Sequence, residues 1–293
     1  MKRNIFHFKS AFSSSQIVII LLLLYLPSGN LKSQVFGNLI EKNIQSTVLI
    51  NIGSISGSAI LVQDTLLRLH LITAKHVIFN PQNNFLNINS NEAKVHFYAQ
   101  NFKSDSINHI TLNLDKLLQS GMVRKDSLID IAVITIAQIE KSGAIRYFDG
   151  VSRSGRPVNY TPYPIWNETT TSVENLYLGE DVLVVGFPSS LGLRQSPQFD
   201  YNIPLLKRGS IASVSDNFQT FVIDCAVYRG NSGGPVFLER KSFDKYSLRL
   251  IGIVVEYIPL INPTVTKKDV YIETSSYAVV VPIEYANKLI YSN

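Results

Sequence analysis

A serine set among glycines is the sharpest chemical feature of this sequence. It occurs in Gly230-Asn231-Ser232-Gly233-Gly234-Pro235. Such a serine suits a nucleophile on a tight turn, because glycines permit unusual backbone angles and let a substrate chain approach closely. Backbone N–H groups just before and at the serine can then point at a developing oxyanion, since no side chains block them. A plain glycine-rich hairpin turn is the alternative interpretation.

A histidine and an aspartate stand where they could assist that serine. His76 follows an apolar strand, and histidine can serve as a general base because it gains and loses a proton near neutral pH. Asp130 opens the apolar run 131–136, where an acid is costly to bury without a partner. A histidine is the natural partner, and the acid would fix its tautomer and stabilise the imidazolium. A structural histidine and a strand-edge aspartate are the alternatives, and Asp126 is the nearest rival to Asp130.

The order of these three residues along the chain points to one family. His76, Asp130 and Ser232 follow the chymotrypsin order, which differs from that of subtilisins and α/β-hydrolases. The surrounding residues resemble the trypsin-like serine peptidases: TAKHV is similar to the TAxHV box, DIAVI to the D-[IL]-A-[VL] box and GNSGGP to the GDSGGP/GNSGGP box. The resemblance extends over about residues 45–285. It is closest to the bacterial HtrA-type protease domain.

The resemblance implies an all-β fold and a mechanism. The fold would be a chymotrypsin-like double barrel of two six-stranded antiparallel β-barrels, with the site in the cleft between them. His76 and Asp130 would come from the first barrel and Ser232 from the second, and the N–H groups of Gly230 and Ser232 would form the oxyanion hole. Ser232 would attack a peptide carbonyl, and water would release the acyl-enzyme. The implied function is a serine endopeptidase with a polypeptide substrate. A catalytically inert binding module on the same fold and an esterase using the same triad are the alternatives.

The resemblance also implies a substrate pocket. By position, its wall would include Ala226, Val255 and Tyr257. Ala226 would occupy the base, where trypsin-like enzymes of basic specificity place an acid, so a small or apolar substrate side chain is expected. Glu256 argues against an apolar pocket if it points inward. Asn231 stands where animal members activated by cleavage have Asp, so that kind of zymogen switch is not implied.

The hydrophobic pattern agrees with an all-β chain. After residue 34, short apolar runs rich in Val, Ile, Tyr and Phe alternate with polar loops. No helices alternate with these runs, which argues against a doubly wound parallel sheet. A short C-terminal helix is expected at residues 283–291. Strands are expected at residues 47–52, 58–62, 66–73, 94–99, 131–136, 181–186, 209–214, 220–226, 235–238, 248–257 and 277–282.

A single protease domain is expected over residues 34–293. Its first barrel would span about residues 40–145 and its second about 177–285, with a linker or insertion at 146–176. The spacing of the three site residues exceeds what a compact barrel pair needs, so residues 80–127 and 146–176 should include extra surface loops. HtrA proteins carry PDZ domains after the barrel. Too few residues follow Pro282 for one, so a stand-alone protease domain is expected.

Residues 1–33 are typical of a targeting segment. Lys2, Arg3 and Lys9 precede an uninterrupted apolar run at residues 17–26. Such a run suits a signal peptide and is short for a bilayer span. We therefore expect a secreted or periplasmic, cell-envelope protein. An uncleaved N-terminal anchor is the alternative, and only then would the membrane be a partner.

Charge and composition exclude other classes of function. The net charge is +5, but four basic residues and no acid lie in residues 1–33, which leaves the rest nearly neutral. A nucleic-acid partner is therefore not expected. Cys225 is the only cysteine, so no intramolecular disulfide can form, and it is expected to be a small buried hydrophobe. The sequence has no metal-ligand cluster or cofactor motif, so neither a metal nor a cofactor is expected.

Overall fold

Antiparallel strands build most of the regular structure. The computed structural model describes residues 40, 43–97, 108–154, 162–165, 169–189, 200, 203–214, 219–241, 246–261 and 272–292. The expected signal peptide at residues 1–33 lies outside the described residues. None of the helices in the described part of the chain is long and apolar enough to cross a membrane.

The first half of the chain forms one twisted sheet of ten strands. The main path through this sheet runs in the order β6-β7-β3-β2-β1-β4-β5-β9, while β10 pairs with β2 and β8 with β7. Its strands are β1 (Thr47–Ile52), β2 (Ile55–Gln63), β3 (Arg68–Thr73), β4 (Glu92–Phe97), β5 (Asn108–Asn113), β6 (Val123–Lys125), β7 (Ala132–Ile139), β8 (Ile145–Tyr147), β9 (Val151–Ser154) and β10 (Tyr163–Pro164). In β4, buried and exposed side chains alternate as expected for a sheet with one solvated face.

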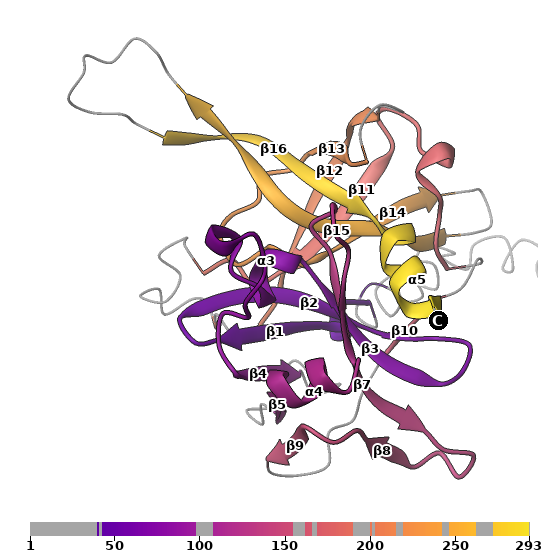
Figure 1. Ribbon diagram of the computed structural model, residues 1–293. Helices are drawn as coiled ribbons and strands as arrows, with labels where there is room; N and C mark the ends of the chain where they lie inside the picture. Colours follow the sequence, from indigo (N-terminus) through magenta and orange to yellow (C-terminus); the bar gives the residue numbers. More distant parts are fainter. Residues whose placement is uncertain are drawn as a thin grey trace, which may run out of the picture. The chain divides into compact units, whose positions relative to one another are not determined.

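The second half closes into a six-stranded barrel in the order β11-β12-β13-β16-β15-β14. The strands are β11 (Asp181–Gly186), β12 (Leu205–Val214), β13 (Phe221–Asp224), β14 (Pro235–Lys241), β15 (Tyr246–Ile261) and β16 (Ile272–Pro282). Closure pairs the strand edges that an open sheet would leave free. Apolar side chains from all six strands, among them Val184, Ile223 and Val236, fill the interior. The hairpin of β15 and β16 extends well beyond the barrel (Figure 1).

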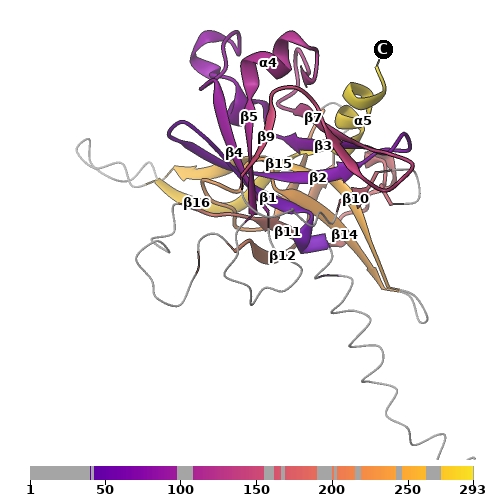
Figure 2. The same cartoon turned by 90° about the horizontal axis from the view of Figure 1, so that it is seen from below.

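The sheet and the barrel pack against each other. β11 contacts β1 and β2, and the three strands lie together in Figure 2. The C-terminal helix α5 (Ile283–Tyr291) follows β16 and contacts β7 of the first sheet. Its buried side chains recur at helical spacing. Arg68 and Arg124 of the first sheet donate to the last carbonyls of α5, those of Ile290 and Leu289.

Two further short helices and two 3₁₀ turns lie between these strands. They are α3 (Lys75–Ile78), η1 (Pro81–Asn83), α4 (Leu114–Gln119) and η2 (Val173–Asn175). α3 follows β3 directly. Asn113 caps α4 by accepting a hydrogen bond from the Lys116 N–H at 3.0 Å.

The predicted all-β, chymotrypsin-like double barrel with a short C-terminal helix is confirmed. The second barrel is closed by six strands as expected, whereas the first half forms an open sheet of ten strands, eight of them on its main path. The extra loops expected at residues 80–127 are in part regular structure, because β4, β5, α4 and β6 lie there. β5 carries polar residues at most of its positions, so its sequence gives little signal for a strand without its neighbours β4 and β9.

Candidate active site

The turn that carries Ser232 requires glycine on both sides. Gly230 and Gly233 have φ angles of 96° and 84°, in the left-handed region that glycine adopts most easily. A Cβ on Gly230 would collide with the carbonyl oxygen of Phe187, and one on Gly233 with that of Ser58. The serine is therefore held on a tight, closely packed turn, and it is itself partly exposed.

The backbone N–H groups of this turn fall into two sets. Those of Asn231, Gly233 and Gly234 donate within the protein, to Tyr228, Val254 and Asn231 at 3.0, 2.7 and 2.8 Å. Among the described residues, the N–H groups of Gly230 and Ser232 have no such acceptor. Two unused donors therefore remain at the positions predicted for the oxyanion hole.

His76 and Asp130 are brought together by the pairing of β3 with β7. Thr73 at the end of β3 lies opposite Ala132 at the start of β7, so the two side chains leave the same end of the strand pair. His76 Nδ1 lies 2.7 Å from Asp130 Oδ2, and the His76 backbone N–H donates to Asp130 Oδ1 at 2.9 Å. Their side chains are 29% and 30% exposed. With the proton on Nδ1, shared with the carboxylate, Nε2 is left as an acceptor.

Asp126, the rival acid, has a different role. Its carboxylate accepts the N–H groups of Leu128 and Ile129 at 2.9 and 2.8 Å, so it shapes the loop before Asp130. The side chain of Lys75 supports the same loop. Lys75 Nζ donates to the carbonyl oxygen of Asp126 at 2.9 Å, and burial lowers the pKa of this lysine. Sequence reasoning missed Lys75, whose only signal was its place beside His76.

Ser58 joins the two halves of the candidate site. It lies in β2 and is fully buried. Its Oγ donates to the Gly230 carbonyl at 2.7 Å and accepts from the Phe187 N–H at 2.9 Å. Its N–H donates to the Ser232 carbonyl at 2.8 Å, and its own carbonyl accepts from Thr73 Oγ1 at 2.7 Å. Sequence reasoning missed this residue, although a small polar side chain in an apolar strand was a signal.

Gly57 shows how near the helix of His76 comes to the serine turn. A Cβ on Gly57 would lie 2.9 Å from both methyl groups of Val77 and 3.3 Å from the carbonyl oxygen of Ser232. Val77 is the neighbour of His76 in α3. The helix that carries the histidine and the turn that carries the serine therefore meet beside Gly57. The structure brings together the segments of all three predicted catalytic residues.

The predicted pocket residues lie beside this turn in the second barrel. Val255 is 8% exposed, Ala226 is partly buried, and the partly buried Tyr257 packs against the barrel core. Glu256 is exposed. Hydrogen bonds between Val254 and the two glycines after Ser232, at 2.7 and 2.9 Å, hold this part of β15 against the nucleophile turn.

A cation lies beside the expected apolar pocket base. Lys207 Nζ donates to the Ala226 carbonyl oxygen at 2.7 Å and lies 3.9 Å from the centre of the Tyr228 ring. Sequence reasoning missed this lysine. Cys225, next to Ala226, is buried, and burial raises the pKa of its thiol to about 11. The thiol is therefore protonated at neutral pH, as in an inert core cysteine.

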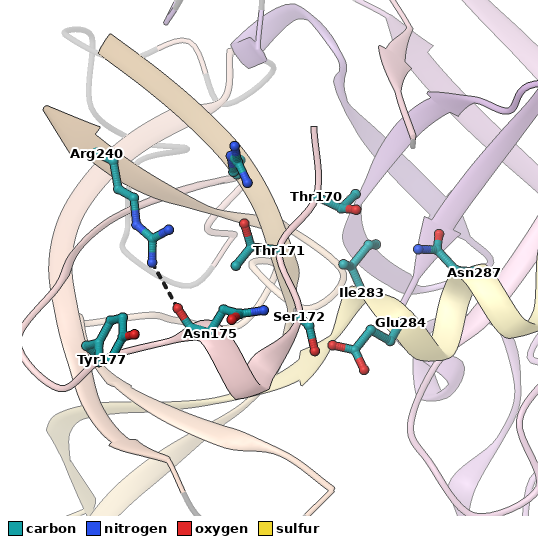
Figure 3. A pocket seen from close by; sticks show the side chains of 10 residues that line it. Thr170, Thr171, Ser172, Asn175, Tyr177, Arg240, Ile283, Glu284 and Asn287 are labelled. Carbon is teal, nitrogen blue, oxygen red and sulfur yellow. Dashed lines mark hydrogen bonds between the residues drawn. The ribbon is translucent and has the colours of Figure 1, made fainter. Parts of the chain in front are cut away.

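A cavity of about 520 Å³ lies elsewhere, between the second barrel and the start of α5 (Figure 3). None of the predicted site residues lines it. Two of its charged side chains serve the fold: Arg240 donates to the Asn175 carbonyl at 2.9 Å and Glu284 accepts the Val173 N–H at 2.8 Å. In the described part of the chain, no group of three or more His, Cys, Asp or Glu side chains is placed to hold a metal ion.

Comparisons with known proteins agree with the fold. Residues 57–243 match the family model of the trypsin-like peptidase domain. Among solved structures, Deg5 is similar with a TM-score of 0.50 and 17% identity, over 88% of this chain and 92% of that chain. The HtrA-type protease AlgW with tripeptide has a TM-score of 0.50 and 14% identity, over 88% of this chain and 62% of that chain. No curated protein matches the chain. The chain belongs to the trypsin-like peptidase family, the serine proteases that its sequence motifs resemble.

Proposed function

We propose that this protein is a serine endopeptidase that cleaves polypeptides through His76, Asp130 and Ser232. The observation that carries the proposal is the double contact from Asp130 to His76, at 2.7 Å to Nδ1 and 2.9 Å to the backbone N–H. One carboxylate thus fixes both the position and the tautomer of the imidazole. A histidine held in this way suits a general base and then a general acid.

The reaction would proceed through an acyl-enzyme. Ser232 Oγ attacks the carbonyl carbon of the scissile peptide while His76 Nε2 takes its proton. The oxyanion accepts hydrogen bonds from the N–H groups of Gly230 and Ser232, which have no backbone acceptor among the described residues. His76 then gives its proton to the leaving amine as the C–N bond breaks. Finally His76 deprotonates a water molecule, which attacks the acyl carbon and releases the new carboxylate and Ser232.

The proposed place of action is outside the cytoplasm, in secreted or cell-envelope form. It is supported by residues 1–33, in which basic residues precede an apolar run, as in a signal peptide. A secreted chain without disulfides depends on its apolar core to stabilise the fold. The apolar interior of the second barrel and the buried apolar side chains of the first sheet, such as Ile50, Ile60 and Leu71, contribute to such a core.

Digestion of an unfolded protein substrate tests the proposed activity. The purified full chain is incubated with reduced casein, and the products are sequenced by mass spectrometry beside Ser232→Ala. We expect internal cleavage by the wild type and none by the variant. Ser213→Ala, which changes an exposed serine of β12, should cleave like the wild type. Cleavage that survives Ser232→Ala, or turnover of simple esters without any peptide cleavage, would refute the endopeptidase assignment.

A further inference from the structure

The side chain of Lys207 starts from the interior face of the second barrel. In the register of the sheet, Lys207 of β12 lies opposite Val184 of β11. Opposed residues of neighbouring antiparallel strands place their side chains on the same face. Val184 belongs to the barrel core, so the Lys207 side chain leaves the sheet toward the interior.

The ammonium group reaches the segment that leads to Ser232. It donates a hydrogen bond to the carbonyl oxygen of Ala226, the residue predicted at the pocket base, and it lies over the ring of Tyr228. The carbonyl of Tyr228 in turn accepts the N–H of Asn231, the neighbour of Ser232. The positively charged side chain of Lys207 therefore supports the turn that carries Ser232.

Among the residues that the structure describes, no carboxylate is paired with this ammonium group. Within the described ranges Lys207 forms no ion pair, whereas the adjacent Arg208 is paired with Glu239 at 2.7 Å. Burial lowers the pKa of Lys207, because the charged form loses solvation. An ammonium has three donors, and the Ala226 carbonyl uses one of them. A partly buried cation without a counter-ion is costly, so an arriving carboxylate would find a favourable partner.

We propose that Lys207 determines the substrate specificity of this protein by binding the acidic side chain of the residue whose carbonyl Ser232 attacks. The substrate class is then polypeptides cleaved after glutamate or aspartate. This inference rests on the proposed function, and it replaces the apolar preference expected from Ala226 alone. A neutral or apolar side chain on this substrate residue would cover the ammonium group of Lys207 without forming an ion pair with it. A substrate carboxylate supplies the missing charge and a charge-assisted hydrogen bond.

Isosteric substrates test the assignment. Two peptides are compared that differ only in Glu or Gln before the scissile bond. The wild type should favour Glu in kcat/KM by about ten-fold or more, the size of one hydrogen bond to a charged group. Lys207→Met removes the charge and keeps an apolar stem, so the ratio of kcat/KM for the Glu peptide to that for the Gln peptide should fall to about one.

Lys288→Met is the matched control. Lys288 also lies over a tyrosine ring, that of Tyr285 at 4.8 Å, but it belongs to the exposed face of α5. This variant should keep the preference of the wild type for Glu. Equal cleavage of the two peptides by the wild type would overturn the proposal. So would a preference for Glu that persists in Lys207→Met.

Binding separates this inference from the proposed function. Ser232→Ala is titrated by calorimetry with acetylated peptides that end in Glu or in Gln. Tighter binding of the Glu peptide, lost when Lys207→Met is added, supports the role of Lys207 even if the wild type cleaves nothing. In that case only the endopeptidase assignment fails. Equal affinity for the two peptides overturns the inference even if the protein is an active peptidase.

Discussion

The hydroxyl of Ser58 donates a hydrogen bond to the carbonyl oxygen of Gly230 at 2.7 Å, across a sequence separation of 172 residues. Gly230 is the residue whose N–H we assign to the oxyanion hole. The same hydroxyl accepts the N–H of Phe187, so it fixes the serine turn relative to β11. A side chain of the first sheet therefore sets the orientation of a peptide group in the second barrel.

Ser58→Ala should impair turnover more than substrate binding. The change removes two buried hydrogen bonds of the Ser58 hydroxyl, to the Gly230 carbonyl and from the Phe187 N–H, at a cost of about 1–3 kcal/mol. If the turn relaxes, the oxyanion donors move, and kcat should fall by roughly ten-fold or more with KM little changed. Steady-state kinetics and urea unfolding measure the two effects.

Ser46→Ala is the control for that substitution. Ser46 is also buried and donates one hydrogen bond, to the Asn43 carbonyl at 2.6 Å, outside the candidate site. It should lose about 1 kcal/mol of stability and no kcat. A folded Ser58→Ala protein with the kcat of the wild type would contradict the positioning role.

Asp130→Asn should nearly abolish activity, whereas Asp126→Asn should not. Asparagine at position 130 can hold His76 in the wrong tautomer, and the expected loss in kcat is roughly 10⁴-fold. Asp126→Asn changes the loop contacts to Leu128 and Ile129, so a small loss of stability is expected. The kcat of both variants on a peptide substrate decides between them. A larger loss of kcat in Asp126→Asn than in Asp130→Asn would show that Asp126, and not Asp130, is the catalytic acid.

Gly233→Ala should damage the fold and the site, and Gly143→Ala should not. The two glycines have similar φ angles of 84° and 82°, so the positive φ should destabilise an alanine by a similar amount, about 1–2 kcal/mol, at both positions. Only at Gly233 would the new methyl also collide with Ser58 and Thr73, whereas nothing lies within 4 Å at Gly143. Thermal unfolding should show the larger loss for Gly233→Ala. Equal losses would mean that the turn is less tightly packed than described.

A buried carboxylate should make stability depend on pH in the acid range. Burial of Asp64 would raise its pKa, but hydrogen bonds from His70 and Arg68 outweigh this and lower the pKa from 3.8 to about 2. The folded state therefore binds this proton less readily than the unfolded state. The stabilisation is present above about pH 4 and is lost as the pH falls toward 2.

Asp64→Asn isolates that contribution. The free energy of unfolding of the wild type should fall by about 2 kcal/mol more than that of the variant between pH 4 and 2. Arg68→Met should make this acid-dependent loss of unfolding free energy smaller than in the wild type, since the guanidinium lies 2.7 Å from the Asp64 carboxylate. Identical acid profiles for wild type and Asp64→Asn would show that this carboxylate is not stabilised by its partners.

The sequence predicted those parts of the molecule that depend on local pattern. β1, β11 and α5 lie where the apolar runs placed them, with the same end residues. The short β6 and β8 were missed because three-residue strands exist only through their partner β7. Ser58 and Lys207 were missed for a related reason: each acts on a carbonyl whose position is set by the fold and not by neighbours in the chain.

Labelling with a fluorophosphonate probe tests the central claim most directly. The probe reacts with serines that are activated as nucleophiles, and mass spectrometry of the labelled full chain identifies the residue. We predict one modified serine, Ser232, whose labelling is lost in Ser232→Ala and strongly slowed in His76→Ala. Labelling of a different serine, or no labelling of a folded protein, would contradict the assignment of Ser232 and His76 as nucleophile and base.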